Sequence, residues 1–240
     1  MIKHVEIINK KGKVLRGYLD HPEGAEKIVV MFHGYTGNKT EHNGHFRSLS
    51  RDLSAEKIAS LRMDYSCNGE SDGEFSEFLF NDALDDALLM LDYAFSKFQN
   101  VIVLGFSMGG LIATLLCNKR PISKLLLWSP ASDLYTKLRK RFDEANKLDD
   151  GSMYIPGFII TESLVESMKG YDPFKEAEKF TNPVMIIHGR EDLAVNYLTS
   201  VKYGSYFQNA NLHLIDKCGH GYDRYHEKVE LFSKSLNFIK

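Results

Sequence analysis

Three side chains of this sequence could together form a reactive nucleophile: a serine, an aspartate and a histidine. Ser107 lies in the segment 105–110 (Gly-Phe-Ser-Met-Gly-Gly), directly after an apolar run at 101–104 and directly before an apolar stretch at 111–116. A serine between glycines at the turn from a strand to a helix is typical of an exposed nucleophile, because the sharp bend lifts its hydroxyl above the sheet. A structural serine in a glycine-rich turn is the alternative interpretation.

A serine hydroxyl reacts only when a base accepts its proton and an acid orients that base. Asp192 follows the apolar run at 183–187, and His220 lies between two glycines after the run at 210–215. Functional groups collect beyond the carboxyl ends of parallel strands, so these three side chains are expected to meet. The sequence therefore predicts Ser107 as the nucleophile, His220 as the base and Asp192 as the acid.

Serine attack on a carbonyl also needs two backbone N–H groups that bind the oxyanion. One is expected from Met108, the residue after the nucleophile, and the other from Tyr35, in the loop 33–37 that follows the apolar run at 28–32. Each donor of this kind contributes about 3 kcal/mol to transition-state stabilisation. His33, at the start of the loop, is expected to pack beneath it.

The sequence contains further aspartate and histidine side chains that could take part in catalysis or bind a metal. Asp133, beyond an earlier apolar run, is an alternative acid, but Asp192 is favoured because it ends a His-Gly-x-x-Asp turn. His188, at the start of that turn, is expected to order it. His42 and His45 have no cysteine or carboxylate at metal-ligand spacing, so the sequence predicts neither a metal nor a cofactor.

Composition narrows the class of protein. The chain has 240 residues, of which 43% are apolar, and a net charge of −2 without a long block of like charges. This length fits one domain over residues 1–240, and the charge is not that of a nucleic-acid-binding protein. No stretch approaches the roughly 18–20 apolar residues of a membrane span, and the three cysteines form no disulfide framework. We expect a cytoplasmic protein that acts on a small molecule, and we leave a homodimer open.

The order of the predicted elements indicates the fold. Residues 5–19 favour an antiparallel hairpin, and apolar runs then alternate with helix-length segments such as 46–55 and 83–92. Strands joined by helical crossovers form a parallel sheet covered by helices. The sequence therefore predicts an α/β fold with a mostly parallel central sheet, an N-terminal antiparallel hairpin and helices on both faces.

The alternation stops between about residues 131 and 180, which we interpret as a lid or cap insertion above the sheet. The cationic cluster at 137–141 is either a solvated face or a region that steers an anionic substrate. The apolar run at 153–160, broken by Pro156 and Gly157, is either the wall of a lid over an acyl or aromatic group or simple packing over the sheet end. We expect this insertion to decide which substrate is bound.

Together these segments resemble the α/β-hydrolase superfamily, and within it bacterial carboxylesterases of the cinnamoyl (feruloyl) esterase type and, more distantly, monoacylglycerol lipases. The likeness covers nearly the whole chain outside the insertion. It rests on the segments 33–39, 62–65 with 69–73, 105–110, 188–195 and 219–220. One departure is the segment 66–69 (Ser-Cys-Asn-Gly), where relatives commonly carry Gly-His-Gly, in a loop expected to border the site.

The resemblance implies a serine carboxylesterase that hydrolyses small esters, with short acyl or hydroxycinnamoyl groups, through an acyl-enzyme and without a cofactor. It places the nucleophile at Ser107, the acid at Asp192, the base at His220 and the oxyanion amides at Tyr35 and Met108. Thioesterase, acylglycerol lipase and peptidase activities use the same groups and stay open as alternatives. A non-catalytic binding protein with the same fold is a further alternative.

Overall fold

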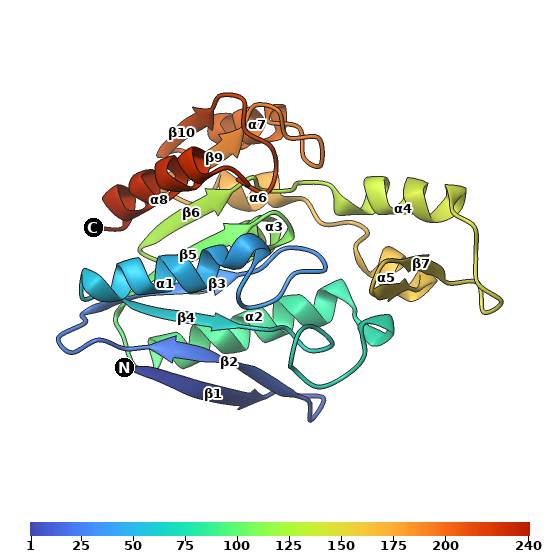
Figure 1. The fold of residues 1–240 in the computed structure, drawn as a ribbon, viewed down its shortest axis with the longest axis horizontal. Coiled ribbons are helices and arrows are strands. Elements are labelled where there is room, and N and C mark those ends of the chain that lie inside the picture. The colour runs from blue at the N-terminus through green and yellow to red at the C-terminus, as the bar shows by residue number, and fades with distance from the viewer.

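An eight-stranded sheet forms the centre of the computed structural model, which describes residues 1–240 (Figure 1). The strands are β1 Ile2–Ile8, β2 Val14–Asp20, β3 Lys27–Phe32, β4 Ala59–Met63, β5 Asn100–Phe106, β6 Lys124–Trp128, β9 Val184–Gly189 and β10 Ala210–Ile215. Their order across the sheet is β1-β2-β4-β3-β5-β6-β9-β10. β1 and β2 form an antiparallel hairpin and β2 is antiparallel to β4, whereas every other pair is parallel. The predicted fold class is confirmed.

Helices cover both faces of this sheet. The helices of the chain are α1 His45–Ala55, α2 Phe80–Phe95, α3 Met108–Leu116, α4 Leu134–Glu144, α5 Glu162–Ser167, α6 Pro173–Ala177, α7 Leu198–Tyr206 and α8 Tyr225–Ile239, with short 3-10 helices η1 His42–Gly44 and η2 Phe75–Glu77. Successive side chains of a strand point to opposite faces, so each central strand contributes to two cores. In β5, Val101 and Val103 belong to the core under α2 and α3, whereas Ile102 and Leu104 belong to the core under α1 and α8.

Helix α3 packs directly against the sheet because glycines let two backbones touch. A Cβ atom on Gly109 would lie 1.9 Å from the carbonyl oxygen of Phe32 in β3. A Cβ atom on Gly105 would lie 2.2 Å from the carbonyl oxygen of Gly109. Both distances are far below van der Waals contact, so only glycine permits the turn from β5 into α3.

We expect Gly109→Ala to destabilise the protein by about 3 kcal/mol or more, because β3 or α3 must move to admit the methyl group. Gly204→Ala is a matched control in α7, where no atom lies within 4 Å of the added carbon. The control should gain about 0.5–1 kcal/mol from its higher helix propensity. Urea unfolding measures both changes. A Gly109→Ala variant as stable as the wild type would contradict the close approach of α3 to β3.

Residues 131–180 extend past the carboxyl ends of the parallel strands (Figure 1). α4 and α5 pack against each other, and beside them β7 (Met153–Ile155) and β8 (Phe158–Ile160) form a small antiparallel hairpin. Its turn falls at Pro156 and Gly157, the residues that interrupt the apolar run. α6 contacts α3 and α7, so the chain has returned to the helical layer before β9 begins. No helix of the protein combines the length and apolar character that a membrane span requires.

Candidate active site

Ser107 occupies a strained backbone position between β5 and α3. Its φ of 54° and ψ of −115° are unusual for a residue with a side chain, and such strain concentrates at functional sites. Hydrogen bonds hold the turn: the N–H of Ser107 donates to the carbonyl of Trp128 at 2.9 Å, and its own carbonyl accepts from the N–H of Ala131 at 3.0 Å. The surrounding strands therefore fix the direction of the serine side chain.

The structure brings together the three side chains predicted as nucleophile, base and acid. The Oγ of Ser107 lies 3.0 Å from Nε2 of His220, and Nδ1 of His220 lies 2.5 Å from Oδ2 of Asp192. The three residues follow β5, β10 and β9 at the same edge of the sheet. With the imidazole proton on Nδ1, His220 donates to Asp192 and can accept a proton from Ser107.

The carboxylate of Asp192 is fully satisfied. Its Oδ1 accepts from the backbone N–H groups of Ala194 and Val195, at 2.8 and 2.7 Å. Its Oδ2 accepts from His220 and also lies 3.0 Å from Nε2 of His188. Burial alone would raise the pKa of Asp192, but the hydrogen bonds from the two histidines outweigh it and hold the pKa well below its usual value. The carboxylate therefore stays ionised.

His188 is the site residue whose position the sequence did not reveal. It was expected to order the turn after β9, and it does contact the carbonyl of Val195, at 2.9 Å. Its Nδ1 also lies 2.6 Å from the hydroxyl of Ser200, so that Nε2 is free to donate to Asp192. The four-residue spacing from His188 to Asp192 was the available signal, because such a short turn can bring the two side chains together.

Asp133, the alternative acid, has a different partner. Its carboxylate accepts from the backbone N–H of Thr136 at 2.9 Å and caps the start of α4. His220 makes its carboxylate contact with Asp192 instead. The geometry therefore favours Asp192 over Asp133 as the acid.

The two expected oxyanion amides face no acceptor within the protein. The backbone N–H groups of Tyr35 and Met108 make no hydrogen bond to any backbone or side-chain acceptor. Glu41 orders the loop that carries Tyr35, because its carboxylate accepts from the N–H of Gly34 at 2.6 Å. His33 is buried beneath this loop, where its Nδ1 lies 2.9 Å from the carbonyl of Gly34. Both amides are therefore unpaired within the protein.

A cavity of about 500 Å³ lies above Ser107. Its lining is mostly polar and consists of Gly34, Tyr35, Thr36, Gly37, Asn38, Glu41, His42, Phe106, Ser107, His220, Gly221 and Asp223. Two of these residues, His42 and Asp223, contact each other directly, with Nε2 and Oδ1 2.6 Å apart. The Nε2 atom of His45 lies 2.8 Å from the carbonyl of Gly221.

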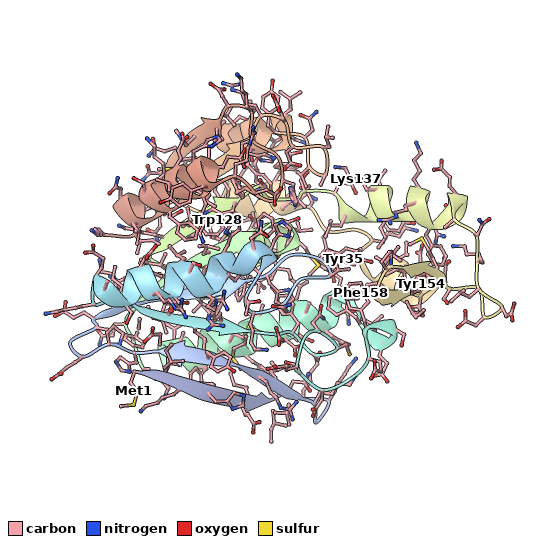
Figure 2. All side chains as sticks on the ribbon, viewed as in Figure 1. Met1, Tyr35, Trp128, Lys137, Tyr154 and Phe158 are labelled. Carbon is pink, nitrogen blue, oxygen red and sulfur yellow. The ribbon has the colours of Figure 1, made fainter.

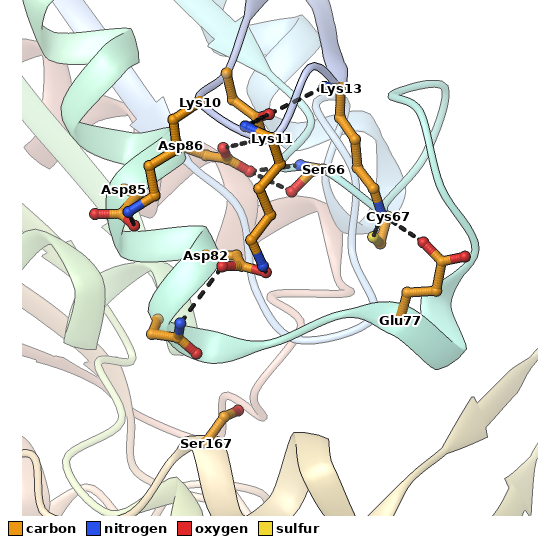
Figure 3. A network of polar contacts seen from close by, with 12 residues as sticks. Lys10, Lys11, Lys13, Ser66, Cys67, Glu77, Asp82, Asp85, Asp86 and Ser167 are labelled. Carbon is orange, nitrogen blue, oxygen red and sulfur yellow. Dashed lines mark hydrogen bonds and ion pairs between the residues drawn. The ribbon is translucent and has the colours of Figure 1, made fainter.

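The loop at 66–69 lies outside the residues that line this cavity, contrary to the expectation that it borders the site. A polar network holds it toward the β1–β2 hairpin and α2 (Figure 3). The N–H and hydroxyl of Ser66 both donate to Asp86, at 2.8 and 2.6 Å. Lys13 lies 3.0 Å from the sulfur of Cys67 and also pairs with Glu77. The segment 66–69, where the sequence departs from the family pattern, is therefore held by structural contacts away from the cavity above Ser107.

No other side chain of the site is a competing nucleophile or forms a metal centre. Cys218, two residues from His220, is buried, and burial raises the pKa of its thiol to about 12. That thiol stays protonated at neutral pH and is a poor nucleophile. No group of three or more histidine, cysteine, aspartate or glutamate side chains is arranged to hold a metal ion.

Comparison with known protein families identifies the chain. The model of the family described as serine aminopeptidase, S33, matches residues 23–150, which is more than half of the sequence. The chain belongs to the S33 serine aminopeptidase family. This membership and the fold confirm the resemblance to α/β-hydrolases and make the protein a hydrolase of the serine type. No curated protein matches the chain by sequence.

Solved structures similar to this S33-family protein include esterases. Est1E from Butyrivibrio proteoclasticus, solved with ferulic acid bound, is 27% identical, with 98% of this chain and 99% of that chain covered and a TM-score of 0.81. Mouse α/β hydrolase domain-containing protein 10 is 19% identical, with 99% and 98% covered and a TM-score of 0.82. An esterase from Pyrococcus furiosus is 20% identical, with 100% and 90% covered and a TM-score of 0.77. The last two likenesses concern the fold alone.

Proposed function

We propose that this protein is a serine carboxylesterase that hydrolyses small carboxylic esters through an acyl-enzyme. The observation that carries the proposal is the chain of contacts from Asp192 through His220 to Ser107, next to two unpaired backbone amides. These are the nucleophile, base, acid and oxyanion donors that acyl transfer needs.

The reaction proceeds in two steps. His220 Nε2 accepts the hydroxyl proton as Ser107 Oγ bonds to the ester carbonyl carbon, and the N–H groups of Tyr35 and Met108 bind the oxyanion. The intermediate collapses as the bond to the alcohol oxygen breaks, and His220 gives its proton to the departing alcohol. Water then attacks the acyl-enzyme with His220 again as the base, which releases a carboxylic acid and restores Ser107. Asp192 stabilises the imidazolium in both steps.

An ester is the favoured substrate class because Est1E, at 27% identity over nearly the whole chain, is an esterase solved with a small aromatic acid. Short acyl and hydroxycinnamoyl esters follow from that likeness. The description of the S33 family favours a second candidate, cleavage of the amide bond at the N-terminus of a peptide. Both reactions use the same two steps and differ in the leaving group.

Parallel assays separate these functions. We expect hydrolysis of p-nitrophenyl butyrate and methyl ferulate, little or no cleavage of an amino-acid p-nitroanilide, and a fluorophosphonate adduct on the peptide that contains Ser107. Faster cleavage of the anilide than of either ester would favour the aminopeptidase. The absence of both hydrolysis and labelling would identify a binding protein instead. Matched thioester and monoacylglycerol substrates test the remaining alternatives.

A further inference from the structure

A buried tyrosine, Tyr222, holds the loop that carries His220. It lies two residues after His220, is completely buried and does not line the cavity above the site. Its hydroxyl donates to the carbonyl of Ile187 in β9 at 2.9 Å and lies 2.8 Å from the hydroxyl of Ser129. A tyrosine hydroxyl has one hydrogen, so Ser129 is the donor in the second contact. The loop after β10 is therefore tied to β9 and to the end of β6.

The end of β6 also holds the nucleophile. The carbonyl of Trp128, the last residue of β6, accepts from the N–H of Ser107 at 2.9 Å. Figure 2 shows Trp128 in the interior of the molecule, where its ring contacts α1 and α8. The next residue is Ser129, the partner of the tyrosine. Two consecutive residues thus hold the turn of Ser107 on one side and the loop of His220 on the other.

Both partners of this contact have unusual backbone conformations. The φ angle is 51° at Tyr222 and 41° at Ser129, in the left-handed region that favours glycine. A residue with a side chain persists there only when the surrounding structure holds it, and such positions cluster at functional sites. Gly221 and Asp223, on either side of Tyr222, line the cavity above Ser107. The conformation at Tyr222 therefore also places part of the cavity wall.

The ring of Tyr222 supports the base through Phe106. The centroids of these two rings are 6.3 Å apart, and the ring of Phe106 lies 5.0 Å from the imidazole of His220. Burial raises the pKa of Tyr222 well above its usual value, so its hydroxyl remains a donor at neutral pH. The hydroxyl and the ring together restrict the loop from which the imidazole extends toward Ser107.

We propose that Tyr222, acting with Ser129, is a positioning residue that sets the distance between the base and the nucleophile. The proposal rests on the function proposed above, in which His220 accepts the proton of Ser107. Without the hydroxyl, the loop at 219–223 loses two buried hydrogen bonds, and Nε2 of His220 can move from its place 3.0 Å from Oγ of Ser107. A displacement of about 1 Å at a reacting group can lower the rate about a hundredfold.

Tyr222→Phe keeps the ring and removes only the hydroxyl. We expect kcat for p-nitrophenyl butyrate to fall between about tenfold and a hundredfold with KM unchanged, because the substrate still binds while the base is displaced. Labelling by a fluorophosphonate should slow by a similar factor, since it needs the same proton transfer. Ser129→Ala should lower kcat by a smaller factor. The double variant should lose no more than Tyr222→Phe, because both substitutions break the same contact.

Ser235→Ala is the control for a loss of stability alone. Ser235, completely buried on α8, accepts from the indole N–H of Trp128 at 3.0 Å and donates to the carbonyl of Leu231 at 2.7 Å. Its removal breaks two buried hydrogen bonds, as Tyr222→Phe does, but neither leads to the loop of His220. Urea unfolding should show similar losses of stability in the two variants, whereas kcat of Ser235→Ala should equal that of the wild type.

The outcomes distinguish the positioning role from the function on which it rests. A wild-type kcat in Tyr222→Phe overturns the role and leaves the esterase intact. Equal losses of kcat in Tyr222→Phe and Ser235→Ala, or losses that multiply in the double variant, overturn it as well. If Tyr222→Phe does not fold, an unchanged kcat in Ser129→Ala overturns it. Failure of the wild-type protein to hydrolyse the ester overturns the proposed esterase itself.

Discussion

The Ser107→Ala variant is expected to hydrolyse p-nitrophenyl butyrate about a million-fold more slowly than the wild-type protein, the loss seen when the nucleophile of a serine hydrolase is removed. Alanine leaves His220, Asp192 and both amides in place, but no atom remains that can form the acyl-enzyme. The variant should retain only the small rate enhancement over the uncatalysed reaction that the oxyanion donors and substrate binding provide. Steady-state kinetics measure the loss of hydrolysis, and fluorophosphonate labelling measures the loss of the atom that forms the covalent adduct.

A surface serine provides the matched control for this experiment. The hydroxyl of Ser205 donates to the carbonyl of Lys202 on α7, far along the chain from the site, so Ser205→Ala should retain full activity and labelling. Circular dichroism should show the same fold for both variants. Unchanged hydrolysis by Ser107→Ala, with its fold intact, would rule out the proposed mechanism.

Asp192→Asn is expected to lower kcat by about 10⁴, because an amide cannot hold His220 in the tautomer that accepts the serine proton. The contacts of Asp192 make the loss severe: Oδ2 receives both histidines and Oδ1 receives two backbone amides. The amide nitrogen of asparagine, a donor, would have to face at least one of these donors.

Asp133→Asn is the control that distinguishes the two candidate acids. Asparagine caps a helix about as well as aspartate, so this variant should keep α4 and nearly wild-type activity. Initial-rate kinetics on the ester substrates compare the two variants. If Asp133→Asn lowered kcat as much as Asp192→Asn, the contact between Asp192 and His220 seen in this structure would not be the one used in the reaction.

Much of the fold could be predicted because long periodic segments dominate it. The apolar run at 101–104, followed by the glycines around Ser107, forms β5 and α3, and the hairpin at 5–19 forms β1 and β2. The spacing of polar residues beyond strand ends selected Ser107, Asp192 and His220, which the structure brings into contact. Their catalytic roles await the experiments described above.

Short elements and loop positions could not be predicted. α6 has five residues and β7 and β8 have three each, which is too few for a period to be recognised. The loop at 66–69 is placed by Asp86, a residue on α2 that binds Ser66 from 20 positions away. Such contacts depend on tertiary packing, which the local sequence does not encode.

The distance along the chain between the reacting groups has a consequence for synthesis. Ser107 and His220 are 113 residues apart, and β10, which positions His220, is the last strand of the sheet to leave the ribosome. On the mechanism proposed above, a nascent chain carries Ser107 long before it carries His220, so it would not yet hydrolyse an ester while it is still being made. Because β10 also lies at the sheet edge, fraying of that edge would move His220 away from Ser107 before the rest of the molecule unfolds, and on the proposed mechanism activity would be lost first.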